Sequence, residues 1–182
     1  MKKQNKTLFI AQAALIAAVY VVLTYLSNLF GLASGAIQVR LSEALTILPY
    51  FTPAAIPGLF VGCLLANLLT GCAPWDVVFG SIATLLGALG TYGISRMARK
   101  KANDSLSTVS YNSKLKWTAP LPPILSNVLI VPWVLRFVYE VPDAIPFLML
   151  TVGIGEVIAC GIIGMILFFA LEKRASQIFQ TA

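Results

Sequence analysis

The feature that most constrains this chain is a succession of six apolar runs, separated by proline, glycine and charged residues. These runs predict membrane spans at about residues 8–30, 37–51, 53–71, 76–97, 118–139 and 145–171. A spanning helix needs roughly 20 apolar residues, so six spans leave no room for a soluble domain in 182 residues. Only 11% of the residues are charged, against about 25% in soluble domains. We therefore expect an all-α membrane protein that forms one integral membrane domain over residues 1–182.

Basic residues predict the orientation of the spans. If both termini are cytoplasmic, eleven of the thirteen Lys and Arg residues lie on the inner side, and only Arg40 and Arg136 lie in the outer half. This distribution satisfies the positive-inside rule for six transmembrane helices. The expected location is the plasma membrane. The same bias, together with anionic lipid, accounts for the net charge of +6 without any binding of nucleic acid.

Acidic residues gather on the opposite side. Glu43, Asp76, Glu140 and Asp143 fall at or near the outer ends of the expected helices. An acidic outer vestibule would favour a cationic or donor-rich solute. For Glu140 and Asp143, ordinary charge in an outer loop is the alternative interpretation.

Arg40 and Glu43 lie one helical turn apart at the start of the short second span. A charge inside a bilayer is costly and usually faces a protein interior or a cavity. The two residues can pair with each other at i and i+3. Alternatively, Glu43 points inward and accepts hydrogen bonds from a solute, while Arg40 keeps it ionised and oriented. Tyr50 lies two turns below Glu43 on roughly the same face and would suit a flat heterocycle.

Glu156 falls near the middle of the last span, among four glycines between residues 153 and 164. Glycines let another backbone approach closely, and they also leave room for a ligand. A carboxylate at this depth needs a partner, so we expect Glu156 to bind the solute or to join an internal polar network. A structural salt bridge with Arg40 or Arg136 is the alternative.

Three more polar residues are candidates for the same site. Asn67 lies near the outer end of the third span and Asn127 near the middle of the fifth. An amide donates and accepts at once, which suits a purine-like edge, although an interhelical hydrogen bond explains it equally well. Asp76 opens the fourth span, where it would either contact the solute or cap the helix.

Small residues on the first span indicate a protein contact. Ala14 and Ala18 form a small-xxx-small pair in its cytoplasmic half, away from the stripe through Tyr20 and Thr24 that is expected to face inward. Such pairs allow close contact between helices. We expect Ala14 and Ala18 to contact a partner protein.

Enzymatic chemistry is not indicated. The chain contains no histidine, which excludes Ser/His and Cys/His catalysis and histidine metal sites. Cys63, Cys72 and Cys160 follow no metal or redox spacing and are interpreted as small membrane residues. No acid pair has a metal-ligand spacing along the chain. We expect no catalytic residue, no metal and no cofactor.

Taken together, these features resemble the substrate-binding (S) components of energy-coupling factor (ECF) transporters. Within this group, the runs IQVRLSEALTILPYFTPAAIPGLFVGCLLANLL and DVVFGSIATLLGALGTY are similar to the QueT family, importers of queuosine precursors. The resemblance implies partnership with a membrane coupling subunit, which Ala14 and Ala18 would meet, and with two ATP-hydrolysing subunits. The chain has no GxxxxGK[ST] loop, so those partners would hydrolyse the ATP.

The resemblance also implies a 7-deazaguanine solute: 7-aminomethyl-7-deazaguanine, its cyano relative or queuine. A carboxylate would accept N1–H and 2-NH2, an amide would donate to O6, a second acid would hold a cationic aminomethyl group, and an aromatic ring would stack on the base. The first carboxylate would be Glu43 or Glu156, and the amide would be Asn67 or Asn127. The second acid would be Asp76 or Glu140. The stacking ring would be that of Tyr50, Trp75 or Trp133.

The main alternative is a stand-alone, proton-coupled transporter of a small aromatic heterocycle, with Glu156 as the proton carrier. The six spans show no evident inverted repeat, which argues against this alternative.

Overall fold

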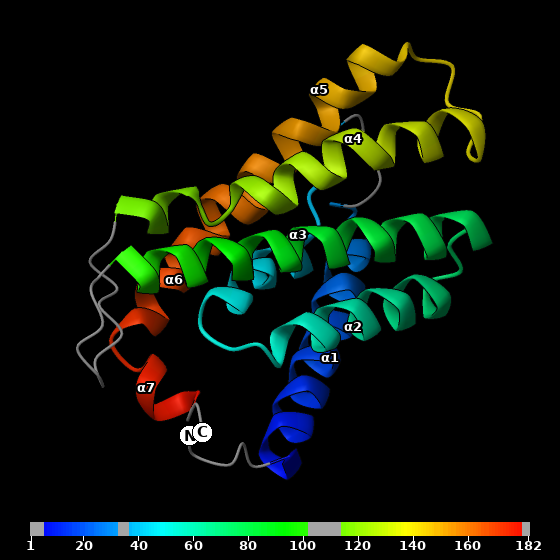
Figure 1. Ribbon diagram of the computed structural model, residues 1–182. Helices are drawn as coiled ribbons and strands as arrows, with labels where there is room; N and C mark the ends of the chain where they lie inside the picture. Colours follow the sequence, from blue (N-terminus) through cyan, green and yellow to red (C-terminus); the bar gives the residue numbers. More distant parts are fainter. Residues whose placement is uncertain (1–5, 33–36, 102–113, 180–182) are drawn as a thin grey trace.

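The structure is a computed structural model that describes residues 6–32, 37–101 and 114–179 (Figure 1). Every regular element in these ranges is helical. In chain order they are α1 (Lys6–Leu29), η1 (Leu41–Tyr50), α2 (Ala55–Leu69), α3 (Pro74–Lys101), η2 (Lys114–Thr118), α4 (Leu121–Phe137), α5 (Ile145–Glu156), η3 (Val157–Ile163), α6 (Gly164–Glu172) and α7 (Ala175–Ile178). The elements η1 and η2 are 3₁₀-helices, and η3 is a π-helix that continues α5 into α6.

Within the described ranges, four helical segments are long and apolar enough to cross a membrane. They are Lys6–Leu29, Pro74–Ala98, Lys114–Phe137 and Ile145–Glu172, and they match the first, fourth, fifth and sixth predicted spans. The all-helical architecture is thereby confirmed, and the four segments are consistent with a membrane protein. The third predicted span, α2, is apolar but has 15 residues. At 1.5 Å per residue it covers about 22 Å, less than the roughly 30 Å of a bilayer core.

The second predicted span differs from the expected α-helix. Residues 37–40 are not helical, and η1 starts only at Leu41. Its ten residues rise about 2.0 Å each, so η1 is roughly 20 Å long. The Thr46 hydroxyl donates to the Glu43 carbonyl (2.6 Å), and Pro49 has no N–H to donate. Because η1 and α2 are both shorter than the bilayer core, six membrane crossings stay a prediction.

The helix η1 occupies the centre of the bundle. Every residue of it from Ser42 to Tyr50 is buried, and it contacts α1, α2, α3, η3 and α6. Two glycines of the last helical segment allow this close approach. A Cβ at Gly155 would overlap the carbonyl oxygen of Gln38, and one at Gly164 would lie 3.3 Å from the carbonyl oxygen of Ala44. The chain from residue 38 onward therefore packs directly on the last helix.

Small residues also join α1 to α2. A Cβ at Gly58 would lie 2.8 Å from the Ala13 carbonyl oxygen, and one at Gly62 would lie 2.8 Å from Cβ of Tyr20 and 3.0 Å from Cα of Ala17. These glycines are one turn apart, so the two backbones can touch along one stripe. This contact places Tyr20 in the interior.

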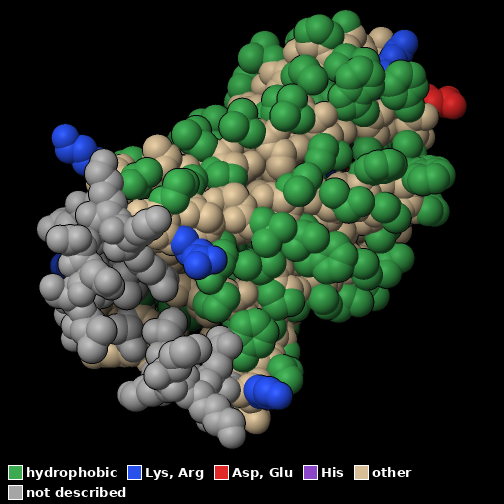
Figure 2. Space-filling model, in the orientation of Figure 1, with side chains coloured by type: hydrophobic (Ala, Val, Ile, Leu, Met, Phe, Trp, Pro, Cys, Tyr) green, Lys and Arg blue, Asp and Glu red, His purple; other side chains and the backbone are tan. Residues whose placement is uncertain are grey.

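The surface fits an apolar environment. Figure 2 shows hydrophobic side chains along the length of the visible face and charged side chains toward its ends. The expected orientation is not tested, and Lys2, Lys3 and the polar segment 102–113 lie outside the described residues.

We predict that Gly62→Ala destabilises the protein, because the added methyl group must displace Tyr20 or Ala17. Overpacking of this kind costs about 1–3 kcal/mol. Gly93→Ala in α3 is the matched control, since a Cβ there meets nothing within 4 Å and alanine favours a helix. Thermal unfolding in detergent should show a lower Tm for Gly62→Ala alone. Equal Tm values for the two variants would contradict the contact.

Candidate solute-binding site

Glu43 lies at the centre of a buried polar cluster. Its side chain is 3% exposed, and each carboxylate oxygen has a donor. The Tyr20 hydroxyl of α1 donates to Oε1, and the Asn127 amide of α4 donates to Oε2 (3.4 Å). A buried carboxylate is tolerated only when it is hydrogen-bonded. Three elements therefore hold one carboxylate in a fixed orientation.

A second carboxylate lies next to the first. Glu156 ends α5, and Cys160 follows in the π-helix η3. The Cys160 sulfur lies 3.1 Å from Oε2 of Glu156 and 3.3 Å from the carbonyl oxygen of Glu43, so its S–H can donate to either. Ligand atoms of Glu43, Glu156 and Cys160 all lie within 4.8 Å of one another. No two acids have a metal-ligand spacing along the sequence. The fold nevertheless brings Glu43 and Glu156 together, and this pair can surround a cation or a donor-rich group.

Asn67 belongs to a neighbouring polar group. Its amide nitrogen lies 3.6 Å from the Cys63 sulfur, which also accepts from the Thr84 hydroxyl (3.4 Å). A Cβ at Gly80 would lie 3.1 Å from Nδ2 of Asn67 and 3.4 Å from Oδ1 of Asp76. Because Gly80 has no side chain, the side chains of Asn67 and Asp76 can approach each other there.

Arg40 pairs with Asp76 and not with its sequence neighbour. Its guanidinium lies 3.9 Å from Oδ2 of Asp76, which also accepts from the Tyr139 hydroxyl (2.8 Å). Partial burial and the adjacent Asp76 raise the pKa of Tyr139, so this phenol stays a donor. The ion pair between Arg40 and Glu43, one of the two alternatives considered from the sequence, does not form, because the non-helical residues 37–40 direct Arg40 toward α3 instead.

Asp76 lies in the first turn of α3, where an acid complements the helix dipole. Its carboxylate is also engaged by Arg40 and Tyr139. The alternative salt bridges of Glu156 do not form: Arg40 pairs with Asp76, and Arg136 is exposed and donates to the carbonyl of Val141 (2.8 Å).

Tyr50 lies outside the polar cluster. A 3₁₀-helix has three residues per turn, so residues 43, 46 and 49 share a face and Tyr50 falls beside it. Its ring packs against Phe168 at a centroid distance of 5.0 Å, and its carbonyl accepts from Ser95 (2.6 Å). The expectation that Tyr50 shares a face with Glu43 assumed α-helical spacing, and the structure corrects it.

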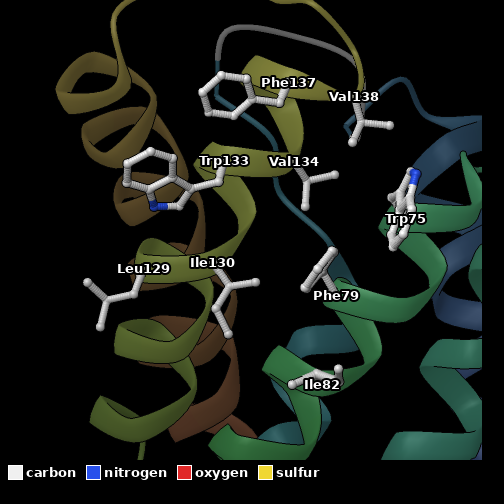
Figure 3. Close-up of a pocket in the computed structure, with 9 residues that line it drawn as sticks. All are labelled: Trp75, Phe79, Ile82, Leu129, Ile130, Trp133, Val134, Phe137 and Val138. Atoms are coloured by element: carbon white, nitrogen blue, oxygen red, sulfur yellow. The ribbon is translucent and has the colours of Figure 1, made fainter.

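Trp75 and Trp133 line a different feature, an apolar groove of about 880 Å³ between α3 and α4 (Figure 3). Each tryptophan stacks on a phenylalanine of its own helix, Phe79 or Phe137, at 6.0 Å. The residues that line the groove carry no charge. A polar heterocycle would find few hydrogen-bonding partners there.

The sequence of this chain matches the model of one known protein family. The family model described as QueT transporter matches residues 10–173, which is most of the chain. The chain belongs to the QueT transporter family. That family consists of transporters and not of enzymes.

One curated relative of this family is similar over part of the chain. It is the "Queuosine precursor transporter QueT" of Lactococcus lactis subsp. cremoris (strain MG1363), 36% identical over 85 residues. The matched stretch is 46% of this chain and spans about half the length of the relative, 49%. No solved structure matches the chain.

Tyr20, Cys63 and Cys160 were not among the residues predicted for the site. Cys63 lies four residues before Asn67, and Cys160 lies four residues after Glu156, which places each thiol near the face of its polar neighbour. That spacing was the available signal. Tyr20 lies on the first-span stripe that was expected to face inward, but nothing in the sequence linked it to Glu43.

We predict that Tyr20→Phe lowers stability, because Glu43 loses a donor inside the bundle. Leaving a buried acceptor with one partner fewer costs about 1–3 kcal/mol. The matched control is Tyr25→Phe on the same helix, whose exposed hydroxyl donates to the Leu69 carbonyl (3.0 Å). Differential scanning fluorimetry should show a larger fall in Tm for Tyr20→Phe. A larger fall for Tyr25→Phe would refute the role assigned to Tyr20.

Proposed function

We propose that this chain is the substrate-binding subunit of an ATP-driven ECF importer in the plasma membrane. It captures a queuosine precursor or related 7-deazaguanine from outside and delivers it to the cytoplasm together with partner subunits. The observation that carries this proposal is the buried cluster of Glu43, Asn127 and Glu156 within a QueT-family chain. The name of the Lactococcus lactis relative supports the choice of solute.

The chemistry of the cluster suits such a solute. A 7-deazaguanine offers N–H donors, and the carboxylates of Glu43 and Glu156 are acceptors. Asn127 already donates to Glu43, whereas the amide of Asn67 makes long contacts with the sulfurs of Cys63 (3.6 Å) and Cys72 (4.0 Å). Asn67 is therefore the better donor for a carbonyl such as O6.

The partner surface is proposed on α1. Ala13 and Ala17 are used inside the protein, because they pack against Gly58 and Gly62. Ala14 and Ala18 are exposed on the same helix. A small-residue pair that none of the described helices covers suits close packing against the coupling subunit.

We predict that the double variant Glu43→Gln/Glu156→Gln does not bind 7-deazaguanines, because both acceptor carboxylates are replaced by amides. Calorimetry on the purified chain should test 7-aminomethyl-7-deazaguanine, its cyano relative, queuine, guanine and riboflavin. Glu172→Gln is the control, since Glu172 pairs with Lys116 (3.0 Å) away from the cluster. Unchanged affinity in the double variant, or equal responses to guanine and the deazapurines, would overturn the assignment.

We predict that Ala14→Leu/Ala18→Leu abolishes uptake and leaves solute binding intact, because larger side chains separate α1 from the coupling subunit. Ala170→Leu, at an exposed alanine of α6, is the matched control and should transport normally. Uptake is measured in proteoliposomes with the ECF partners. Uptake that persists without the ATP-hydrolysing subunits and collapses with an uncoupler would favour a proton-coupled transporter instead.

A further inference from the structure

The described interior carries more acid than base. The side chains of Glu43, Asp76 and Glu156 all contact other polar side chains inside the bundle. Among the described residues, Arg40 is the one basic residue that lies beside these acids. Arg40 pairs with Asp76. Among the described residues the other ion pair joins Lys116 to Glu172, so no basic side chain forms an ion pair with Glu43 or Glu156.

Two neighbouring carboxylates without a cation are unfavourable in an apolar bundle. Removing charges from water costs several kcal/mol per ion, and only close opposite charge or many hydrogen bonds offset it. The recorded donors to the Glu43 and Glu156 side chains are a phenol, an amide and a thiol. All three are neutral groups. Among the described residues, therefore, no positive charge is in direct contact with the pair, and a ligand can supply one.

The spacing of the pair fits a protonated amine. An ammonium group has three donors and no acceptor. With charge-assisted N–H···O distances of about 2.8 Å at tetrahedral angles, it holds two acceptor oxygens about 4.6 Å apart. The ligand atoms of Glu43 and Glu156 lie within 4.8 Å of each other. One ammonium can therefore donate to both carboxylates at once.

The other acids of the outer side fit this role less well. Asp76 is already bound by Arg40 and Tyr139. Glu140 is exposed in the connection between α4 and α5, where its charge remains solvated.

We propose that Glu43 and Glu156 together form the binding site for one protonated amine of the solute. The inference rests on the proposed function for the identity of the ring, and it deepens that function by selecting cationic aminomethyl compounds over neutral ones. The two carboxylates are too close to reach opposite ends of a fused bicycle. For a cationic compound the ring edge is then left to the neighbouring group of Asn67, Cys63 and Thr84, whereas a neutral 7-deazaguanine can turn its N–H donors to the carboxylates.

The test compares two ligands of equal size on the full chain in nanodiscs. 7-Aminomethyl-7-deazaguanine carries the ammonium, and 7-hydroxymethyl-7-deazaguanine replaces it with a neutral hydroxyl. We expect the wild-type protein to prefer the amine by about 30-fold or more, as for a buried charge pair. Glu43→Gln and Glu156→Gln should each reduce this ratio to within a few-fold of one. Glu172→Gln should leave it unchanged.

Retained binding of the hydroxymethyl compound shows that each variant is folded. A wild-type ratio near one overturns the proposal. So does a ratio that survives both glutamine variants, or one that is lost instead in Asp76→Asn or Glu140→Gln.

A second pair of probes separates this inference from the proposed function. Benzylamine and benzyl alcohol at millimolar concentration share a ring and differ in the cation. If no deazaguanine binds, the proposed function fails. The amine site is then supported if benzylamine, but not benzyl alcohol, raises the Tm of the wild type and leaves the Tm of both glutamine variants unchanged. The amine site is overturned if benzylamine has no such effect.

Discussion

The enclosure of η1 is the constraint on which the rest of this structure depends. A ten-residue helix can be surrounded by other helices only if their backbones come very close, and Gly155 and Gly164 provide that closeness on the last helical segment. Because Gln38 and Ala44 rest on these glycines, the position of Glu43 relative to Glu156 is set by backbone contact. The acid pair is therefore a consequence of packing and does not need flexible side chains to form it.

The polar groups of the interior divide by their partners. Arg40, Asp76 and Tyr139 join the segment before η1 to α3 and to the connection after α4. The second set, around Glu43 and Glu156, has only neutral donors among the described residues. The first set is balanced in charge, and the second is not. This difference is the reason why we propose the second set as the ligand-binding part of the protein.

Apolar length predicted most of the fold, because four of the six expected spans correspond to long helical segments. It could not predict η1, since a local sequence does not reveal that a segment will be enclosed on all sides and wound as a 3₁₀-helix. The same limit explains the site. Glu43, Asn127 and Glu156 were expected from their charge or polarity in apolar surroundings. The partner of Arg40 and the place of Tyr50 depend on the direction of the chain at residues 37–40 and on three residues per turn.

Internal packing alone does not explain why position 43 carries an acid. A glutamine there has nearly the same shape, and its carbonyl oxygen would accept from the Tyr20 hydroxyl as Glu43 does. Asn127 could turn its amide and accept from the new NH2 group, so both hydrogen bonds to the side chain at position 43 would be kept. The amide would also avoid the cost of burying a charge. Since the neutral residue would serve the fold at least as well, the carboxylate at position 43 supports the proposal that this residue binds a ligand.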